Sequence, residues 1–244
     1  MKKYLVTGAT GFVGSWVARR LLELNHEVTV LCRDPKKLDP DLFEKCISVV
    51  GDVTDPKSLA KAFKGMDRVY HLAGFVGYSE ELRQKMEEVN VQGTQNVIDA
   101  CKKNKIKELV YMSSVVAIGA SFDPVVLNEN SEYTISDLNL GYFETKRAAE
   151  KLVVEAHKKG VIEAFILNPS TIYGPGDFKK SSRKAQLKVA LGKFPVYTKG
   201  GVSVVSIHDV VEATLLVTEK GTPGERYILS GDNITIKQLF DLIA

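Results

Sequence analysis

Apolar residues in the first two thirds of the chain fall into short runs separated by longer amphipathic stretches. The runs show little apolar–polar alternation, as at 28–31 and 109–112, a pattern typical of strands covered on both faces of a sheet. We predict strands at 3–7, 27–32, 47–50, 68–72, 108–112 and 162–167, and helices at 12–24, 56–63, 79–104 and 141–159. This repeated β-α-β order predicts an α/β fold with a Rossmann-type, doubly wound parallel sheet.

The rhythm loosens after residue 167. We predict helices at 183–191 and 209–218, extended pieces at 195–197, 202–207 and 226–229, and a last helix that opens at Thr235. We therefore expect a dinucleotide-binding core at 1–167, with 168–244 mostly a small substrate-binding cap interleaved with it. The chain ends at Ala244 inside an amphipathic stretch without a C-cap signal, so we expect the cap to be incomplete.

Composition narrows the class of protein. The 244 residues are 44% hydrophobic and 26% charged, and 33 basic against 30 acidic residues leave a net charge of +3. That balance is too small and too mixed for a nucleic-acid partner. No apolar run approaches the ~18 residues of a membrane span. The three cysteines lack C-x-x-C spacing and the four histidines are scattered, so we expect free thiols, a cytoplasmic protein and no metal site.

A glycine-rich turn follows the first strand. Gly8, Gly11 and Gly14 stand in G-x-x-G-x-x-G spacing between a predicted strand and a predicted helix. The first permits a tight turn, the second lets the backbone approach a pyrophosphate, and the third lets the helix pack on the strand. The helix start then offers N–H groups to phosphates. The expected cofactor contacts here are Gly8, Thr10, Gly11, Phe12, Val13 and Gly14.

The end of the second strand bears on the choice between NAD and NADP. An NAD site places an acidic residue there to bind the ribose 2′-hydroxyl, but this chain has Cys32 followed by Arg33. A guanidinium suits a 2′-phosphate, and Lys37 adds charge, so the sequence favours NADP over NAD. The alternatives are that Arg33 is a solvated loop residue, or that Asp34 is the acid rather than the start of a turn.

The third and fourth strands end in further candidate contacts. Asp52, beside Val53, either bonds the adenine amino group or forms an Asx turn after the strand. At the end of the fourth strand, small residues would keep the backbone close to the cofactor. The contacts expected there are Leu72, Ala73 and Gly74. We interpret the preceding His71 as a structural histidine.

Tyr142 and Lys146 share one face of a predicted helix because they lie four residues apart. One such pair is expected by chance in this composition, so its meaning comes from position. Ser113 and Ser114 end the fifth strand, at the carboxyl edge where ligands bind in open α/β sheets.

In this order the motifs resemble the extended short-chain dehydrogenase/reductase family, also known as the NAD-dependent epimerase/dehydratase superfamily. The resemblance spans about residues 4–243, and Cys-Arg-Asp-Pro after the second strand is most similar to dihydroflavonol-reductase-like members. The strand after the cap departs from the family: Val205-Ser206-Ile207-His208-Asp209-Val210 stands where relatives usually show His-Val-Asp-Asp-Val. The remaining motifs are Asn90-Val91-Gln92-Gly93-Thr94 and Asn168-Pro169-Ser170-x-x-Tyr173-Gly174-Pro175-Gly176.

The resemblance implies roles for the site residues. Tyr142 would be the general acid/base, and Ser114 would bind the substrate oxygen. Lys146 would bind the nicotinamide ribose and lower the pKa of Tyr142. Ser113 would be a neighbour satisfied by the backbone, and Asn90 would fix the central helix or a proton-relay water. Pro169 and Ser170 would lie near the nicotinamide.

The implied function is NADP-dependent reduction of a ketone or aldehyde to an alcohol. Two alternatives stay open, a nucleotide-sugar epimerase or dehydratase with tightly bound NAD(P), and a non-catalytic NADP-binding scaffold. The basic stretch 178–184 is either a solvated face or a contact for nucleotide-sugar phosphates. The resemblance also implies a homodimer through a four-helix bundle of helices 79–104 and 141–159. The apolar residues considered for that contact are Val89, Val97, Ala100, Ala149 and Val153.

Overall fold

We analysed a computed structural model of the whole chain, which describes residues 1–177, 181–193 and 196–244. Its centre is a seven-stranded sheet in the order β3-β2-β1-β4-β5-β6-β9, with every neighbouring pair parallel. The strands are β1 (Lys3–Thr7), β2 (Glu27–Cys32), β3 (Ile47–Val50), β4 (Arg68–His71), β5 (Glu108–Met112), β6 (Glu163–Pro169) and β9 (Arg226–Leu229). The doubly wound parallel sheet predicted from the sequence is thus confirmed.

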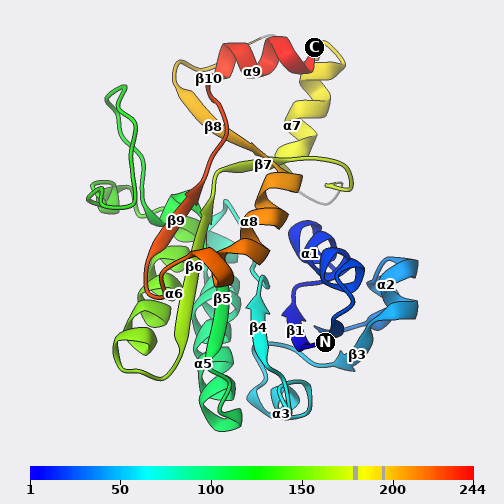
Figure 1. Cartoon of the computed structure of the whole chain (residues 1–244). Coiled ribbons are helices and arrows are strands. Elements are labelled where there is room, and N and C mark those ends of the chain that lie inside the picture. The colour runs from blue at the N-terminus through cyan, green and yellow to red at the C-terminus, as the bar shows by residue number, and fades with distance from the viewer. Residues whose placement is uncertain (178–180, 194–195) are drawn as a thin grey trace.

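Helices cover both faces of the sheet (Figure 1). One face packs against α1 (Phe12–Glu23), α2 (Pro40–Lys45) and α8 (Ile207–Lys220). The other packs against α3 (Pro56–Ala62), α5 (Gly93–Asn104) and α6 (Gly141–Lys158). The chain order reverses between β1 and β4, and that switch point is where open α/β sheets bind ligands.

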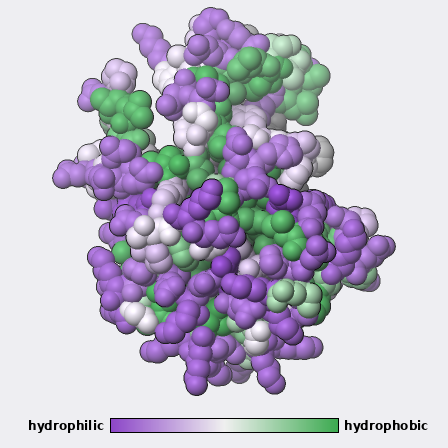
Figure 2. Space-filling model, in the orientation of Figure 1, coloured by the Kyte–Doolittle hydropathy of each residue, from purple (hydrophilic) through white to green (hydrophobic). Residues whose placement is uncertain are grey.

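A second, smaller sheet lies beyond the carboxyl ends of the central strands (Figure 1). Its order is β10-β8-β7, and β8 pairs parallel with β7 but antiparallel with β10. Its strands are β7 (Thr171–Tyr173), β8 (Gly201–Ser206) and β10 (Asn233–Thr235), with α7 (Ser181–Ala190) and α9 (Ile236–Ile243) beside them. Figure 2 shows apolar residues gathered at this end, where Leu187, Leu191 and Leu242 are exposed.

The chain crosses between the two sheets more than once. It leaves the central sheet after β6, builds β7, α7 and β8, returns through α8 and β9, and ends with β10 and α9. Three short elements, α2, β7 and β10, were not predicted, because three to six residues carry too little periodicity to detect. Residues 196–197, expected to be extended, lie in no strand. The basic stretch begins at 178–180, which lie outside the described residues.

The long helix expected at 79–104 consists of several pieces. A 3-10 turn (Glu80–Leu82) leads into α4 (Arg83–Met86), a π-helical segment (Glu87–Gln92) and then α5. π-helical segments are rare and occur frequently at functional sites. This one carries Asn90, which is buried.

The apolar residues considered for a dimer contact mostly face inward. Val97, Ala149 and Val153 have no exposed surface and belong to the core beneath the sheet, while Val89 and Ala100 are partly buried against that core. The homodimer stays a prediction, and three of its five suggested contact residues belong to the core instead. Among the described residues, no helix is both long and apolar enough to span a bilayer.

Candidate active site

The glycine turn is shaped for close approach of backbone segments. Gly8 adopts φ +81°, and a Cβ there would lie 2.7 Å from the amide nitrogen of Ala73. A Cβ on Gly14 would lie 2.2 Å from the carbonyl oxygen of Gly8. Gly11 is the N-cap of α1 and supplies no side-chain hydrogen bond to the helix start. The turn thus brings the backbone of the loop after β4 and the start of α1 close together, and the amides at the helix start have no side-chain cap.

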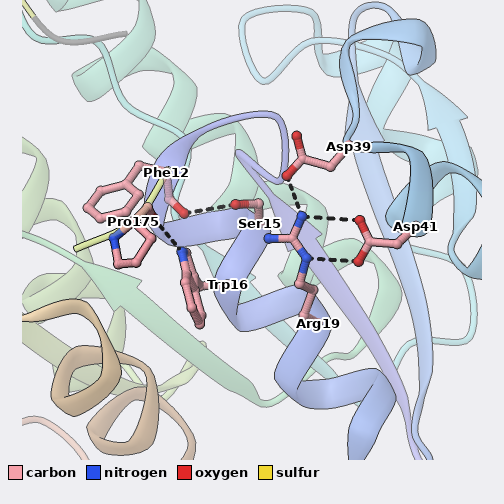
Figure 3. Close-up of polar contacts among 7 residues, drawn as sticks. All are labelled: Phe12, Ser15, Trp16, Arg19, Asp39, Asp41 and Pro175. Carbon is pink, nitrogen blue, oxygen red and sulfur yellow. Dashed lines mark hydrogen bonds and ion pairs between the residues drawn. The ribbon is translucent and has the colours of Figure 1, made fainter. Parts of the chain in front are cut away.

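The start of α1 is tied to two other segments (Figure 3). Trp16 donates from Nε1 to the carbonyl oxygen of Pro175 at 3.1 Å, which joins α1 to the loop after β7. Arg19 pairs with Asp39 and, through Nε at 2.8 Å, with Asp41. The hydrogen bond from Arg19 lowers the pKa of Asp41. Contacts with the loop after β7 and with Asp39 and Asp41 therefore hold α1 in place, in addition to the glycine turn.

At the end of β2, the structure places the two residues on which the choice between NAD and NADP was argued, Cys32 and Arg33. Cys32 is buried, whereas the Arg33 side chain is 74% exposed and its Nε lies 3.8 Å from Oδ2 of Asp52. Asp34 caps the next 3-10 turn and accepts a hydrogen bond from the Lys36 amide at 3.1 Å. Asp34 therefore opens a turn, as predicted, and Lys37 is exposed on that turn.

The ends of β3 and β4 are held by local hydrogen bonds. Asp52 accepts from the amide and hydroxyl of Thr54 at 2.9 and 3.0 Å, which is the Asx turn considered above. Val53 is buried, and its carbonyl accepts from Asn96. After β4, Leu72 and Ala73 are half-buried and Gly74 is exposed. Thr7 holds this backbone, because its hydroxyl accepts from the Ala73 amide at 3.2 Å.

His71 is a satisfied structural histidine, as predicted. Its Nδ1 lies 2.8 Å from the Thr7 hydroxyl and its Nε2 3.1 Å from the Thr94 hydroxyl. Complete burial, and secondarily the charge of Lys146, lower the pKa of His71 to about 3. The imidazole is therefore neutral at physiological pH.

Lys146 is buried beneath the sheet edge. Its Nζ donates to the carbonyl oxygen of Met112 at 2.7 Å and to the hydroxyl of Tyr111 at 3.1 Å. Burial lowers the pKa of Lys146 to about 8, and the carboxylate of Glu150 opposes that shift. The ammonium thus remains charged at neutral pH with one N–H still available.

Ser114 and Tyr142 meet at the same edge. Burial raises the pKa of Tyr142 to about 12, against a hydrogen bond from Ser114 that lowers it. Lys146 is not among the groups that shift this pKa, because its ammonium is turned toward Tyr111 and Met112. The prediction that Lys146 lowers the pKa of Tyr142 is therefore wrong for the chain without cofactor.

Three buried polar atoms lack a hydrogen-bond partner among the described residues near this edge. They are Oγ of Ser113, Oδ1 of Asn168 and Oγ of Ser170, at or just past the carboxyl ends of β5 and β6. Ser113 was expected to be satisfied by the backbone, and that expectation is wrong. Pro169 is the last residue of β6 and lies between Asn168 and Ser170 in the sequence. Unpaired buried polar groups are costly, so a polar ligand such as a nicotinamide riboside fits this edge.

Asn90 has a structural role. Its amide accepts from the Phe75 nitrogen at 2.8 Å and donates to the Phe75 carbonyl at 2.9 Å, and it also reaches the Thr145 hydroxyl at 3.2 Å. It therefore pins the loop after β4 to α6, which is the first of the two roles considered for it.

Sequence reasoning missed Tyr111 and Glu150 as members of the site. Glu150 is buried and accepts from Nδ2 of Asn168 at 2.7 Å and from Nε of Arg226 at 3.0 Å. The same Asn168 nitrogen donates to the Ser114 carbonyl at 3.0 Å. The i, i+4 spacing of Lys146 and Glu150 was an available signal, but the partners from β6 and β9 were not.

The described part of the chain holds no group of three or more His, Cys, Asp or Glu residues that could bind a metal ion.

Residues 4–230 match the model of the NAD dependent epimerase/dehydratase family. The chain is 33% identical to sterol demethylase protein B of Methylococcus capsulatus and 32% identical to a putative dihydroflavonol 4-reductase of Synechocystis. The alignments cover 96% of this chain in both cases, and 71% and 69% of those relatives.

Solved structures share the fold. The crystal structure of gox2253 superposes with a TM-score of 0.91 at 36% identity, over all of this chain and 74% of that one. A double mutant of the dTDP-glucose 4,6-dehydratase DesIV from Streptomyces venezuelae, solved with NAD bound, superposes with a TM-score of 0.85 at 25% identity. That match covers 98% of this chain and 79% of the dehydratase.

Proposed function

The chain belongs to the NAD dependent epimerase/dehydratase family, and from this premise we propose that it is an NADP-dependent oxidoreductase that reduces a carbonyl compound to an alcohol. One observation carries the proposal: Ser114 bonds Tyr142 at the carboxyl edge of β5, where Lys146 bonds the Met112 carbonyl, and buried polar atoms beside them have no partner among the described residues. Relatives named as reductases support the direction of the reaction.

The residues present fit a bound dinucleotide. The amides at Gly8, Gly11 and the start of α1 would hold the pyrophosphate, and Lys146 would bind the nicotinamide ribose. Ser113 and Ser170 offer hydroxyls for the nicotinamide end. When bound, the reduced cofactor supplies the hydride, and the protein supplies position and charge.

Tyr142 is suited to donate the proton. With a pKa of about 12 it keeps its hydrogen at neutral pH, so it can protonate a substrate oxygen that gains negative charge. Ser114, which bonds the same phenol, can donate to that oxygen as well. The ammonium of Lys146 would favour the phenolate left behind. Tyr142 and Ser114 thus act at the substrate oxygen, and Lys146 acts on the phenolate of Tyr142.

The preference for NADP rests on Arg33 and on the absence of an acid at Cys32. The exposed guanidinium is free to turn from Asp52, 3.8 Å away, toward a 2′-phosphate. Arg33→Ala should weaken NADP binding by roughly 1–3 kcal/mol, the scale of a hydrogen bond to a charged group, and should leave NAD binding unchanged. Titration of both cofactors into both proteins measures this, and an equal loss for the two cofactors contradicts it.

The deciding experiment combines cofactor turnover with one hydroxyl deletion. Purified protein and NADPH are incubated with a panel of ketones and aldehydes, and NADPH absorbance is followed. Tyr142→Phe should lower turnover by about 10²–10⁴-fold, the contribution of general acid–base catalysis, while NADPH affinity is kept. Tyr133→Phe is the matched control, because that hydroxyl bonds Glu144 rather than Ser114.

Other outcomes separate the alternatives. Conversion of a nucleotide-sugar without net NADPH change would identify an epimerase or dehydratase. Tight NADPH binding with no turnover on either panel would identify a scaffold. Near-normal turnover by Tyr142→Phe on a genuine substrate would overturn the mechanism.

A further inference from the structure

Lys146 has three N–H groups, and two of them are already used. One bonds the Met112 carbonyl and one the Tyr111 hydroxyl. We propose that Tyr111 is a positioning residue, whose hydroxyl holds the Lys146 ammonium so that the third N–H points toward the cofactor. The inference rests on the proposed function for its consequence in binding, but the contact itself exists in the free chain.

The Tyr111 hydroxyl turns its oxygen toward Lys146. An ammonium can only donate, so Tyr111 presents a lone pair to Nζ of Lys146 at 3.1 Å. Thr94 donates its hydroxyl hydrogen to the Asn90 carbonyl at 2.6 Å, so it accepts from Nε2 of His71 at 3.1 Å.

The same assignment of hydrogen-bond donors and acceptors extends to the loop that follows β4. Because Nε2 of His71 carries the hydrogen, Nδ1 accepts from Thr7 at 2.8 Å. The Thr7 oxygen in turn accepts from the amide of Ala73. One directed chain of hydrogen bonds thus runs from Ala73, a predicted cofactor contact, through Thr7, His71 and Thr94 to the Asn90 carbonyl. It passes beside Tyr111, whose ring centre lies 5.7 Å from that of His71.

Tyr111 and Lys146 are shielded from solvent, so the Tyr111 hydroxyl is an important hydrogen-bond acceptor for the Lys146 ammonium. Tyr111 and Lys146 are 1% and 4% exposed, and Nζ lies 4.7 Å from the Tyr111 ring centre. The titratable groups that act on Lys146 are few: Glu150 on the same helix supports its charge, and neutral His71 faces it from β4. Tyr142, one turn earlier, is protonated. Loss of a hydrogen-bond acceptor in such surroundings disfavours the charged amine.

The test is Tyr111→Phe, which keeps the ring and removes the hydroxyl. In the cofactor-free protein the titration of Lys146, followed by NMR of its side chain and assigned with Lys146→Met, should move down by about one pH unit, a tenfold change in proton affinity. The affinity for NADPH should fall roughly fivefold at pH 8 and less at pH 6, where the amine stays charged in both proteins.

Tyr70→Phe is the matched control. Tyr70 is equally buried and its hydroxyl accepts from Arg68 at 3.0 Å, so it loses a comparable bond far from Lys146. It should leave the Lys146 titration and the pH dependence of NADPH affinity unchanged. Should Tyr111→Phe fail to fold, Tyr111→Leu removes the same hydroxyl and should move the titration in the same direction.

The outcomes separate the two proposals. An unchanged Lys146 titration in Tyr111→Phe, or in Tyr111→Leu if that variant alone folds, overturns the positioning role, whether or not NADPH affinity changes. A shifted titration in a protein that binds neither NADPH nor NADPH analogues supports the contact and overturns the proposed function instead.

Discussion

Two buried cations, Arg68 and Lys146, lie near opposite ends of the neighbouring strands β4 and β5, and their hydrogen-bond partners differ. At the start of β4, Arg68 bonds the Glu108 carboxylate at 2.5 Å and the Tyr70 hydroxyl at 3.0 Å. At the other end of β5, the hydrogen bonds of Lys146 within the described part of the chain go to the Tyr111 hydroxyl and a backbone carbonyl. One cation has a direct carboxylate partner, and the other has neutral acceptors alone.

The difference appears in proton affinity. Burial works against the charge of Arg68, but Tyr70 and Glu108 outweigh it and its pKa is raised. Burial dominates at Lys146 and its pKa falls to about 8. Arg68 is a paired cation whose partners would be left unpaired by its removal, whereas Lys146 keeps an N–H that can bind a ligand and its buried charge costs stability.

The largest expected effect comes from exchanging each cation for methionine. Arg68→Met leaves Glu108 and the Tyr70 hydroxyl without their partner, so it should lower the free energy of unfolding by about 3 kcal/mol, the scale of a broken buried pair, and keep NADPH affinity. Lys146→Met should weaken NADPH binding and change the free energy of unfolding far less. Urea unfolding and cofactor titration measure both, and the reverse pattern would break the comparison.

A second effect concerns alkaline pH. The folded pKa of Lys146, about 8, lies below its ordinary value of 10.5, so between these values the unfolded chain binds a proton that the folded chain does not. Stability linked to this group therefore rises with pH. From pH 7 to 9.5 the wild type should gain about 2 kcal/mol relative to Lys146→Met. Parallel pH dependences in urea unfolding would show that the ammonium is not destabilising.

The smallest effect concerns acid pH and His71. Its folded pKa of about 3 lies below the ordinary 6.5, so the unfolded chain takes up a proton first as the pH falls. Stability is lost below about pH 6.5. Between pH 7 and 5.5 the wild type should lose about 1 kcal/mol more than His71→Asn. Unfolding curves at the two pH values test this, and equal losses would mean that folding does not lower the pKa of His71.

Residues close together in the sequence carried most of the predictable content. The glycine turn, the N-cap at Asp34 and the i, i+4 pair of Tyr142 and Lys146 follow from spacing alone. Their strands and helices formed nearly where apolar periodicity predicted them. The carboxyl edge of β5 could also be predicted, because parallel strands place their ends together.

The pKa of Tyr142 was not predictable in the same way. A lysine four residues away favours a lowered value, but Lys146 is drawn to Tyr111 and Met112, and burial raises the pKa instead. Likewise Ser113 carries a hydroxyl beside backbone carbonyl groups, yet its Oγ makes no hydrogen bond within the described part of the chain. Both outcomes depend on which strands and helices enclose the side chain.

The sequence by itself determined the parallel sheet and the turn at Gly8, because each depends on local conformation and strand periodicity. It implied a shared site for Ser114 and Tyr142 only through the resemblance to a family. Tertiary structure alone decided how Lys146 and Glu150 are partnered. His71 and Tyr111 lie 40 residues apart and pair in register only across β4 and β5, and Glu150 finds Arg226 only when β9 joins the sheet. Burial and hydrogen bonding set the charge of such groups, and both come from segments that only the folded chain brings together.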